Sequence, residues 1–505
     1  MKRKRLLELI AFLLIFAVIS TGLLNALTVK GTPGEPRLYS VYKGYAKNTE
    51  VLFAGSSHAG QLLGRSLWED YGIAAYTVAG NSQPVDIMYF TIKEFLKCEK
   101  PKVIMVETAF IPDDSISDPD TEYAGSTIND SPIRFSLNYL DLAFSQIMNF
   151  KLPVTSEGAQ LVLKWPLEHE RYKNLSKDDF IISMPYVNTD LEPLYSTPDE
   201  EISIITTDKR EKLSDVGEKY LNKLISLCKK EKIELVLFHT PYPAPEISMA
   251  QQNTIGDIAK ENGVQFLDFD YMLDEIGFDP QTDQSRDLNH CNYYGAEKIT
   301  NYIGKYLSES YDVGNHRGDP AYENWDKDLI AYSKHFLKQS FDLSNDISEW
   351  SNVVAGNADD FVIIFTLSGN YKAGDETLIK EILGKFGDYD EFYEKGGTLI
   401  LDHGNVLYNS GDESVYAFTH KFENASLSVN RRKSNDEYAN STPVENDNDG
   451  IYLWGENYIK AVNGLNVMVY DDELDDVTDA VGIDVYLSNT ELFRDKINYD
   501  SLGEE

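Results

Sequence analysis

Cysteine and basic side chains are both scarce in this chain, and each shortage excludes a class of protein. The 505 residues include only three cysteines, Cys98, Cys228 and Cys291, which cannot all pair and show no spacing typical of a metal site. We therefore expect free thiols and a fold that does not depend on disulfides. Lysine and arginine number 46 against 83 aspartates and glutamates, which gives a formal net charge of -37. This field repels phosphate backbones, so we expect no nucleic acid among the partners.

One long apolar run stands at the N-terminus. Residues 9–27 form an apolar run of about 19 residues, near the length needed to cross a bilayer. They follow a basic tip, residues 1–5, which predicts a cytoplasmic N-terminus. We expect an uncleaved transmembrane signal anchor over 6–29, hence a single-pass protein of the cell membrane with its bulk outside the cytoplasm. A cleavable signal peptide is the alternative, but the small-residue cleavage site is poor, since leucine and asparagine interrupt it.

The rest of the chain has the composition of a folded protein, with 42% hydrophobic residues and room for two or three domains. Apolar runs alternate with amphipathic stretches from residue 50 to 269, which is typical of a parallel sheet covered by helices. We predict an α/β domain over 30–327, interrupted at 112–210 by an insertion that forms a helical cap over one sheet edge. The predicted strands are EVLFAGSS, AAYTVAGNS, KVIMVETAF, ELVLFHTP and VQFLDF, and the connecting helices are 86–98, 217–232, 248–262 and 294–310.

The last third of the chain has a different pattern. A helix over about 328–342 is followed by short strands separated by acidic turns, which predicts a β-rich α+β domain over 328–505. The acidic stretch 471–479 is typical of a solvated hairpin loop. Residues 445–456 partly fit a calcium-binding loop, but Glu445 stands where aspartate is expected and the flanks are strand-like. We interpret this stretch as a polar hairpin turn and predict no metal site.

Residues suited to nucleophilic catalysis follow the predicted strands. Ligands of open α/β sheets bind at the carboxyl ends of the strands, where Ser57 follows the first strand. Far downstream, Asp287 and His290 form an Asp-x-x-His pair just before a helix. Serine first and Asp-x-x-His last make a complete set for acyl transfer: Ser57 attacks, His290 takes its proton, and Asp287 orients the imidazole. This chemistry requires no metal or organic cofactor.

The oxyanion donors are less well defined. We expect the backbone N–H groups of Ser57 and Gly80 to face the developing charge, with the Asn81 side chain as a further donor. The alternative is that these motifs are only turns and helix caps, because Asp287 and Asn289 both suit an N-terminal cap. Further residues expected around the site are Ser56, His58 and Thr108, and His239 is expected to be a structural histidine.

The motifs Gly55-Ser56-Ser57, Gly80 and Asp287-x-x-His290 resemble the first, second and last blocks of the SGNH (GDSL-like) hydrolase superfamily. The resemblance covers roughly residues 48–328 and implies a three-layer α/β/α, flavodoxin-like domain. GSSH, GNSQP, KPKVIMVET and DLNHCNYYGAEKIT are also similar to a membrane-anchored group from Gram-positive bacteria. Its relatives include cell-surface polysaccharide O-acetyltransferases and the protein that completes teichoic-acid D-alanylation.

One departure from the family pattern concerns the oxyanion. The third block of the family supplies an asparagine, whereas here the third strand ends Val106-Glu107-Thr108-Ala109. Either Asn81 or Thr108 substitutes, or stabilisation of the oxyanion is weaker. Losing one such donor costs about 10²–10³ in turnover.

A second, fainter resemblance concerns the C-terminal domain. The stretches DDFVIIFTLSGNYKAGDETLIKEILGKFG and NGLNVMVYDDELDDVTDAVGID are similar to segments of the interleukin-like EMT-inducer domain, with Asn463-Gly464 in place of its usual Arg-Gly. This resemblance implies a glycan-binding module.

We therefore expect an extracytoplasmic esterase or O-acyltransferase that handles acetyl or D-alanyl esters of a cell-surface glycan or teichoic acid. A transferase would receive its acyl group from a membrane partner, such as a multi-pass O-acyltransferase. Two alternatives stay open: a catalytically inactive glycan-binding surface protein, and an assembly scaffold for a membrane acyltransferase. The missing third-block asparagine favours the first of these.

Overall fold

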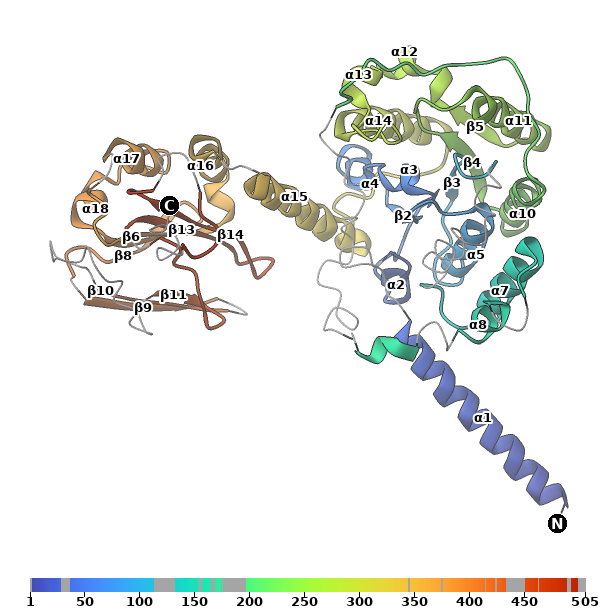
Figure 1. The fold of residues 1–505 in the computed structure, drawn as a ribbon, viewed down its shortest axis with the longest axis horizontal. Helices are drawn as coiled ribbons and strands as arrows, with labels where there is room; N and C mark the ends of the chain where they lie inside the picture. Colours follow the sequence, from blue (N-terminus) through green and yellow to red (C-terminus); the bar gives the residue numbers. More distant parts are fainter. Residues whose placement is uncertain are drawn as a thin grey trace. The chain divides into compact units, whose positions relative to one another are not determined.

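The computed structural model divides the chain into two compact units, Met1–Tyr332 and Ser333–Glu505 (Figure 1). The structure describes residues 2–28, 37–112, 132–153, 157–164, 169–173, 175, 197–343, 346–373, 376–413, 415–422, 425–432, 450–461, 463–487 and 492–497. The long helix α15 (Glu323–Leu343) contains the boundary between the units.

The first unit begins with the apolar helix α1 (Lys2–Leu27). Its segment Glu8–Leu27 has 20 residues and a mean hydropathy of 2.3, so it is long and apolar enough to cross a membrane. Most of the helix is exposed, but its C-terminal end is not: Leu24 and Leu27 are buried, and the Asn25 Oδ1 accepts a hydrogen bond from the Phe135 N–H at 3.0 Å. The end of the apolar helix is therefore attached to the body of the first unit.

A five-stranded sheet forms the centre of this unit, in the order β2-β1-β3-β4-β5. Every neighbouring pair is parallel, as the uninterrupted apolar runs predicted. The order is that of flavodoxin-like doubly wound sheets, which bind ligands where the strand order reverses, here beside β1 and β3. The strands are β1 (Val51–Gly55), β2 (Ala75–Ala79), β3 (Val103–Glu107), β4 (Glu234–His239) and β5 (Gln265–Asp268).

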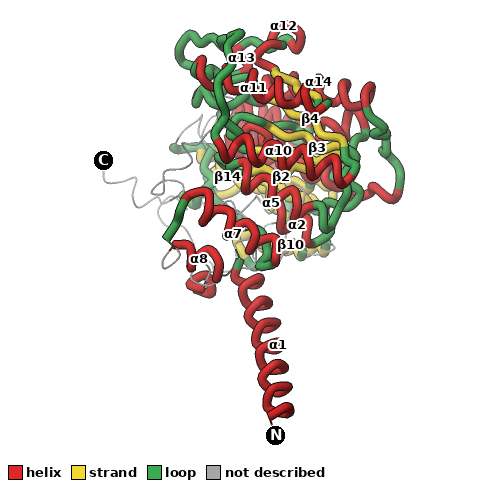
Figure 2. Tube along the Cα trace, turned by 90° about the vertical axis from the view of Figure 1, so that its right-hand side faces the viewer, coloured by secondary structure: helices red, strands yellow, loops and turns green. Residues whose placement is uncertain are grey.

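Two separate cores lie on the two faces of the sheet. Alternate strand residues point to opposite faces, so Leu52 and Ile104 contribute to one core, and Phe53 and Met105 to the other. The first core is covered by α2 (Arg37–Tyr42), α5 (Val85–Phe95), α10 (Asp215–Glu231) and α11 (Glu246–Asn262). Figure 2 shows α10, α5 and α2 lying across the sheet. The second is covered mainly by α14 (Tyr293–Ser310), together with the π-helical turn Leu67–Tyr71.

Short helices complete the first unit: α3 (Ser57–Gly60), α4 (Gly64–Ser66), α12 (Leu273–Ile276) and α13 (Pro280–Asp283). Within the predicted insertion 112–210, the described elements are α7 (Leu137–Phe150), α8 (Glu157–Leu163) and the 3₁₀ turn His169–Lys173. Helix α7 packs on α5, and its Asn138 donates to the Phe90 carbonyl. Much of the insertion lies outside the described residues.

A buried carboxyl at the start of α5 gives the first unit a specific pH dependence. Asp86 is fully buried, one of its oxygens has no hydrogen-bond partner among the described residues, and burial raises its pKa to about 6. Its folded-state pKa lies above the unfolded value, so its contribution to stability is present at low pH and is lost as pH rises through 6. Between pH 8 and pH 5 this group should add about 1.4 kcal/mol to the free energy of unfolding.

Chemical denaturation of the detergent-solubilised chain at both pH values measures this gain. Asp86→Asn should remove it, whereas Asp215→Asn, at an exposed position, should leave it in place. An equal gain in wild type and Asp86→Asn would contradict the assignment.

The second unit has a layer of helices, a five-stranded sheet and a four-stranded sheet. The larger sheet has the order β14-β13-β6-β7-β8 and the smaller β12-β11-β10-β9. All pairs in both sheets are antiparallel. One core lies between the larger sheet and the helices α16 (Ile347–Gly356), α17 (Glu376–Gly384) and α18 (Asp390–Lys395), with the fully buried Trp350 in it. The second core lies between the sheets.

The strands of the second unit follow the predicted alternation of apolar runs and turns. They are β6 (Val362–Ser368), β7 (Gly397–Asp402), β8 (Asn405–Asn409), β9 (Val415–Lys421), β10 (Ser426–Arg432), β11 (Gly450–Leu453), β12 (Glu456–Asn457), β13 (Gly464–Asp471) and β14 (Asp476–Asp484). The acidic stretch 471–479 was predicted as a solvated hairpin loop, but only residues 472–475 form the loop between β13 and β14. The rest belongs to the two strands, and Asp471 and Asp479 are buried. The candidate calcium loop overlaps β11 and β12, and its residues 445–449 lie outside the described part of the chain.

Candidate active site

Ser57 stands at the carboxyl end of strand β1, which lies between β2 and β3, and it is the first residue of the short helix α3. The preceding Ser56 is the N-cap of α3, and its hydroxyl accepts a hydrogen bond from the His58 N–H at 3.3 Å. Gly55 has a φ of +157°, and a Cβ there would lie 2.6 Å from the Cβ of Glu107 and 2.9 Å from that of Ala59. Only glycine fits this turn, which presents the Ser57 hydroxyl at the sheet edge.

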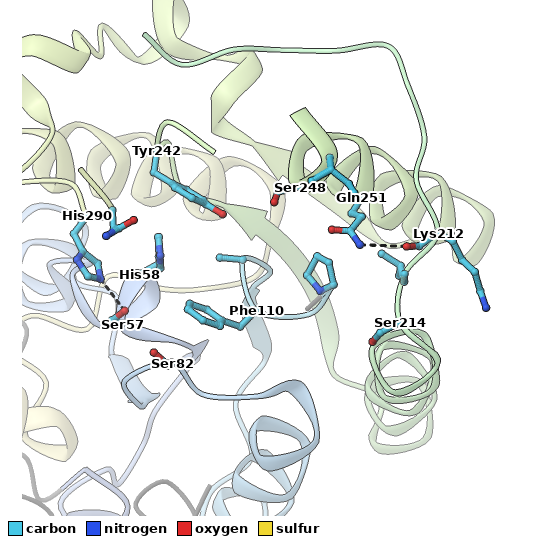
Figure 3. Close-up of a pocket in the computed structure, with 15 residues that line it drawn as sticks. Ser57, His58, Ser82, Phe110, Lys212, Ser214, Tyr242, Ser248, Gln251 and His290 are labelled. Carbon is cyan, nitrogen blue, oxygen red and sulfur yellow. Dashed lines mark hydrogen bonds between the residues drawn. The ribbon is translucent and has the colours of Figure 1, made fainter. Parts of the chain in front are cut away.

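His290 lies in the loop before α14, and its ring bridges Ser57 and Asp287. The His290 Nε2 is 2.8 Å from the Ser57 Oγ (Figure 3). Its Nδ1 is 2.5 Å from the Asp287 Oδ2. Residues 233 positions apart in the sequence therefore meet in one hydrogen-bonded chain. The N-cap of α14 is Asn292, whose side chain accepts from the Gly295 N–H. The interpretation of Asp287 and Asn289 as caps of this helix is therefore wrong.

Hydrogen bonds hold Asp287 in place and ionised. Its Oδ1 accepts from the Ser285 hydroxyl at 2.6 Å and from the backbone N–H groups of Asn289 and His290 at 2.9 and 3.1 Å. Partial burial raises the pKa of Asp287, but the hydrogen bonds from Ser285 and His290 outweigh it and hold the pKa below its usual value. An ionised carboxylate on Nδ1 fixes the tautomer that leaves Nε2 to accept the serine proton, and it stabilises the imidazolium.

The expected oxyanion donors have other contacts in this structure. The Gly80 N–H donates to the Gly55 carbonyl at 3.2 Å, so it is not directed at Ser57. The Asn81 side chain is exposed, and the residue beside the serine is instead Ser82. The Thr108 hydroxyl is buried within 2.7 Å of the Gln252 Oε1. We expected Gly80 or Thr108 to donate a hydrogen bond to the oxyanion. In this structure both donors are instead directed at other acceptors.

Ser57 and His290 open into a cavity of about 740 Å³. Two aromatic rings, Phe110 and Tyr242, lie beside the His58 ring (Figure 3). Farther from the serine, the lining is mixed. It includes the polar side chains Lys212, Ser214, Ser248 and Gln251 and the apolar Pro112, Leu213 and Ile247. Sequence reasoning missed these side chains, because they come from loops and helix ends that carry no motif. Asn289 also lines the cavity, and its Nδ2 donates to the Asp287 carbonyl at 3.1 Å.

A buried ionic cluster, Glu107, His239 and Asp270, lies beneath the site, with all three side chains almost fully buried. The His239 Nε2 is 3.3 Å from Asp270, and its Nδ1 is 3.8 Å from Glu107. Burial lowers the pKa of His239, but the two carboxylates outweigh it and raise the pKa to about 10, so the imidazole is charged. His239 does not line the cavity.

Glu107 connects this cluster to the nucleophile. One carboxylate oxygen accepts from the Ser56 hydroxyl at 2.8 Å, and the other from the Ala109 N–H at 2.6 Å. Ser56 in turn caps α3, the helix that begins with Ser57. Glu107 therefore fixes the turn before the serine.

Comparisons with known proteins add little to this geometry. No family model matches the chain, and no curated protein matches it. Among solved structures, it is similar to a chain described as a lipolytic protein of the G-D-S-L family from Desulfitobacterium hafniense DCB-2. The sequence identity is 11%, the TM-score is 0.27, and the match covers 52% of this chain and 100% of the other. Similarity at this level does not indicate the function of this chain.

The tight turn at Gly55 leads to a prediction about stability. In Gly55→Ala the new Cβ would overlap that of Glu107, and the strand or the turn must shift. We expect a loss of about 2–3 kcal/mol in the free energy of unfolding and a displaced Ser57. Gly263→Ala is the matched control, with a φ of +70° and no atom within 4 Å of the new Cβ. This substitution should lower the free energy of unfolding by about 1 kcal/mol, because alanine is strained in the left-handed conformation. Equal losses in the two variants, measured by chemical denaturation, would contradict the packing argument.

Proposed function

We propose that the protein is an SGNH-like serine esterase or O-acyltransferase that acts outside the cytoplasm. It transfers or hydrolyses acetyl or D-alanyl esters on a cell-envelope polysaccharide or teichoic acid. The observation that carries the proposal is the hydrogen-bonded chain from Ser57 through His290 to Asp287 at the mouth of a cavity. The apolar helix α1 supports a single-pass anchor in the cell membrane.

The reaction follows from the contacts of these three residues. The Ser57 Oγ attacks the ester carbonyl while its proton passes to the His290 Nε2. The tetrahedral intermediate collapses, and the leaving alkoxide takes the proton from the imidazolium. Water or a polymer hydroxyl then attacks the acyl-serine, with His290 again as base, and Ser57 recovers its proton when the second intermediate collapses. Asp287 stays ionised and stabilises the imidazolium in both halves.

The cavity beyond the serine supports a polar acceptor. Its polar side chains are suited to hydroxyl-rich polymers, and the Phe110 and Tyr242 rings to the apolar faces of sugars. The anchor would hold the site near a membrane partner that supplies acyl groups, such as a multi-pass O-acyltransferase. The C-terminal unit is included in the proposal as a glycan-binding module.

Partition of an acyl-enzyme between water and polymer tests this function. The detergent-solubilised full chain is mixed with an isotopically labelled aryl acetate, with or without de-esterified teichoic acid or cell-wall polysaccharide. We expect label on Ser57 and then on the polymer, and neither in Ser57→Ala. Label released only as free acetate would support hydrolysis rather than transfer. Full labelling of the polymer by Ser57→Ala would contradict the proposal.

A non-catalytic role has two observations in its favour. The Gly80 N–H is hydrogen-bonded elsewhere, and no asparagine follows the third strand. A glycan-binding scaffold would need neither a free Gly80 N–H nor an asparagine at that position. Under that alternative, both wild type and Ser57→Ala would bind the polymer and neither would form an acyl-enzyme.

A further inference from the structure

His58 is a buried histidine that faces the same cavity as the nucleophile. It directly follows Ser57 in α3, and only 5% of its surface is exposed. Its ring centroid lies 5.0 Å from that of His290 and 5.1 Å from that of Tyr242. The ring also lines the cavity into which Ser57 opens (Figure 3). The mechanism described above gives this side chain no role.

The hydrogen bond of the His58 Nδ1 determines where the ring carries its proton. Nδ1 lies 3.0 Å from the hydroxyl of Thr240, which is itself buried. Within the described part of the chain, the Thr240 hydroxyl has no other acceptor for its hydrogen. A buried donor left without an acceptor is costly. The hydroxyl hydrogen therefore points at Nδ1, and in the neutral ring the proton is on Nε2.

The ring is uncharged at neutral pH. Burial, helped by the nearby His290 and His239, lowers the pKa of His58 to about 4 despite the opposing effects of Glu107 and Asp287. A neutral imidazole with its proton on Nε2 is a hydrogen-bond donor and a poor base. No described residue accepts a hydrogen bond from Nε2, so this donor is available to a ligand in the cavity.

Beyond the expected Ser57 N–H the site is short of oxyanion donors, and His58 supplies one. The Gly80 N–H is bonded to the Gly55 carbonyl, and the Thr108 hydroxyl lies against Gln252. We propose that His58 is a catalytic residue whose Nε2–H donates a hydrogen bond to the oxyanion that forms on the substrate when Ser57 attacks. This inference rests on the proposed acyl-transfer function and deepens it. A buried neutral donor of this kind stabilises charge that develops only in the transition state.

The step balances without further reactants. As the bond between the Ser57 Oγ and the carbonyl carbon forms, the carbonyl π pair moves onto oxygen, and the serine proton goes to His290. The His58 Nε2–H donates to this oxygen and keeps its proton. When the electron pair on the oxygen re-forms the carbonyl, the bond between the carbon and the oxygen of the leaving alcohol breaks. That alcohol takes the proton from His290.

Two substitutions at position 58 and one at Thr240 separate hydrogen bonding from packing. His58→Phe keeps an aromatic ring but removes the donor, and should lower kcat for an aryl acetate by about 10²–10³-fold with little change in KM. His58→Gln retains a side-chain N–H and should recover at least tenfold of that loss. Thr240→Val removes the group that fixes the tautomer and should lower kcat by a smaller factor.

The control His420→Phe, in the second unit, should have wild-type kinetics. Unchanged kcat in a folded His58→Phe would overturn the proposal while leaving the proposed function intact.

The tautomer can be read without any activity. In the full chain labelled with ¹⁵N-histidine, the His58 signals are identified by their loss in His58→Gln. The proposal expects a neutral ring protonated at Nε2 from pH 5 to 8. Protonation at Nδ1, or titration near pH 6.5, would overturn it whether or not the protein is active. A wild type that forms no acyl-enzyme with any ester would overturn the proposed function and this role together, even with the expected tautomer.

Discussion

Replacing His290 with alanine is expected to lower kcat for an aryl acetate by about 10⁵–10⁶-fold, and Ser57→Ala should be equally damaging. The two residues act as one unit, because the Ser57 hydroxyl is a weak nucleophile unless the Nε2 at 2.8 Å accepts its proton. The double variant should therefore be no worse than either single one. Asp287→Asn should cost about 10⁴-fold through the wrong tautomer of His290.

Steady-state hydrolysis by the detergent-solubilised chain measures these losses. His403→Ala is a suitable control, since it removes a half-exposed histidine of the second unit that pairs with Asp402. It should leave kcat unchanged. A His290→Ala variant that is folded and retains a tenth or more of the wild-type rate would contradict the assigned base.

Removing Asp270 should give the largest loss of stability. Asp270→Ala leaves the charged His239 buried with its nearer carboxylate gone, and breaking a buried pair in this way costs about 3–5 kcal/mol. Asp257→Ala, which breaks the exposed ion pair with Arg210, should cost less than about 1 kcal/mol. The double variant Asp270→Ala/His239→Phe should recover part of the loss, because no unpaired charge remains. Chemical denaturation of each variant measures the free energy of unfolding.

The same cluster has a defined pH dependence. The folded-state pKa of His239, about 10, lies above the unfolded value near 6.5. Its contribution to stability is therefore complete below about pH 6.5 and falls as pH rises towards 10. His239→Phe should remove this part of the pH profile. A wild-type profile identical to that of His239→Phe between pH 7 and 10 would show that the imidazole is not charged.

The sheet of the first unit followed from local patterns in the sequence. Runs such as residues 51–55 and 103–107 are apolar at every position, because both faces of a parallel sheet are covered. This prediction is confirmed, as is the β-rich character of the C-terminal unit, whose sheets are antiparallel. The meeting of Ser57 with His290 was also expected from the order of the motifs, with the serine after the first strand and Asp-x-x-His just before a helix. These features depend on chain order and hydrophobic pattern alone.

Side-chain partners depend on tertiary contacts and were not predictable. Nothing in the sequence links Glu107 to Ser56, or His239 to Asp270, because each pair meets only after the sheet forms. The hydrogen bond from the Gly80 N–H to Gly55 likewise depends on the register between β1 and β2. His58 was expected only near the site, since its Thr240 partner lies 182 positions away.

Covalent labelling of Ser57 tests the central claim most directly. The full chain in detergent is treated with a fluorophosphonate, and the adduct is mapped by mass spectrometry beside His290→Ala and the His403→Ala control. The account predicts an adduct on Ser57 in the wild type and the control, and none in His290→Ala. A folded wild-type protein without an adduct, or one labelled equally in His290→Ala, would contradict an activated serine at this site.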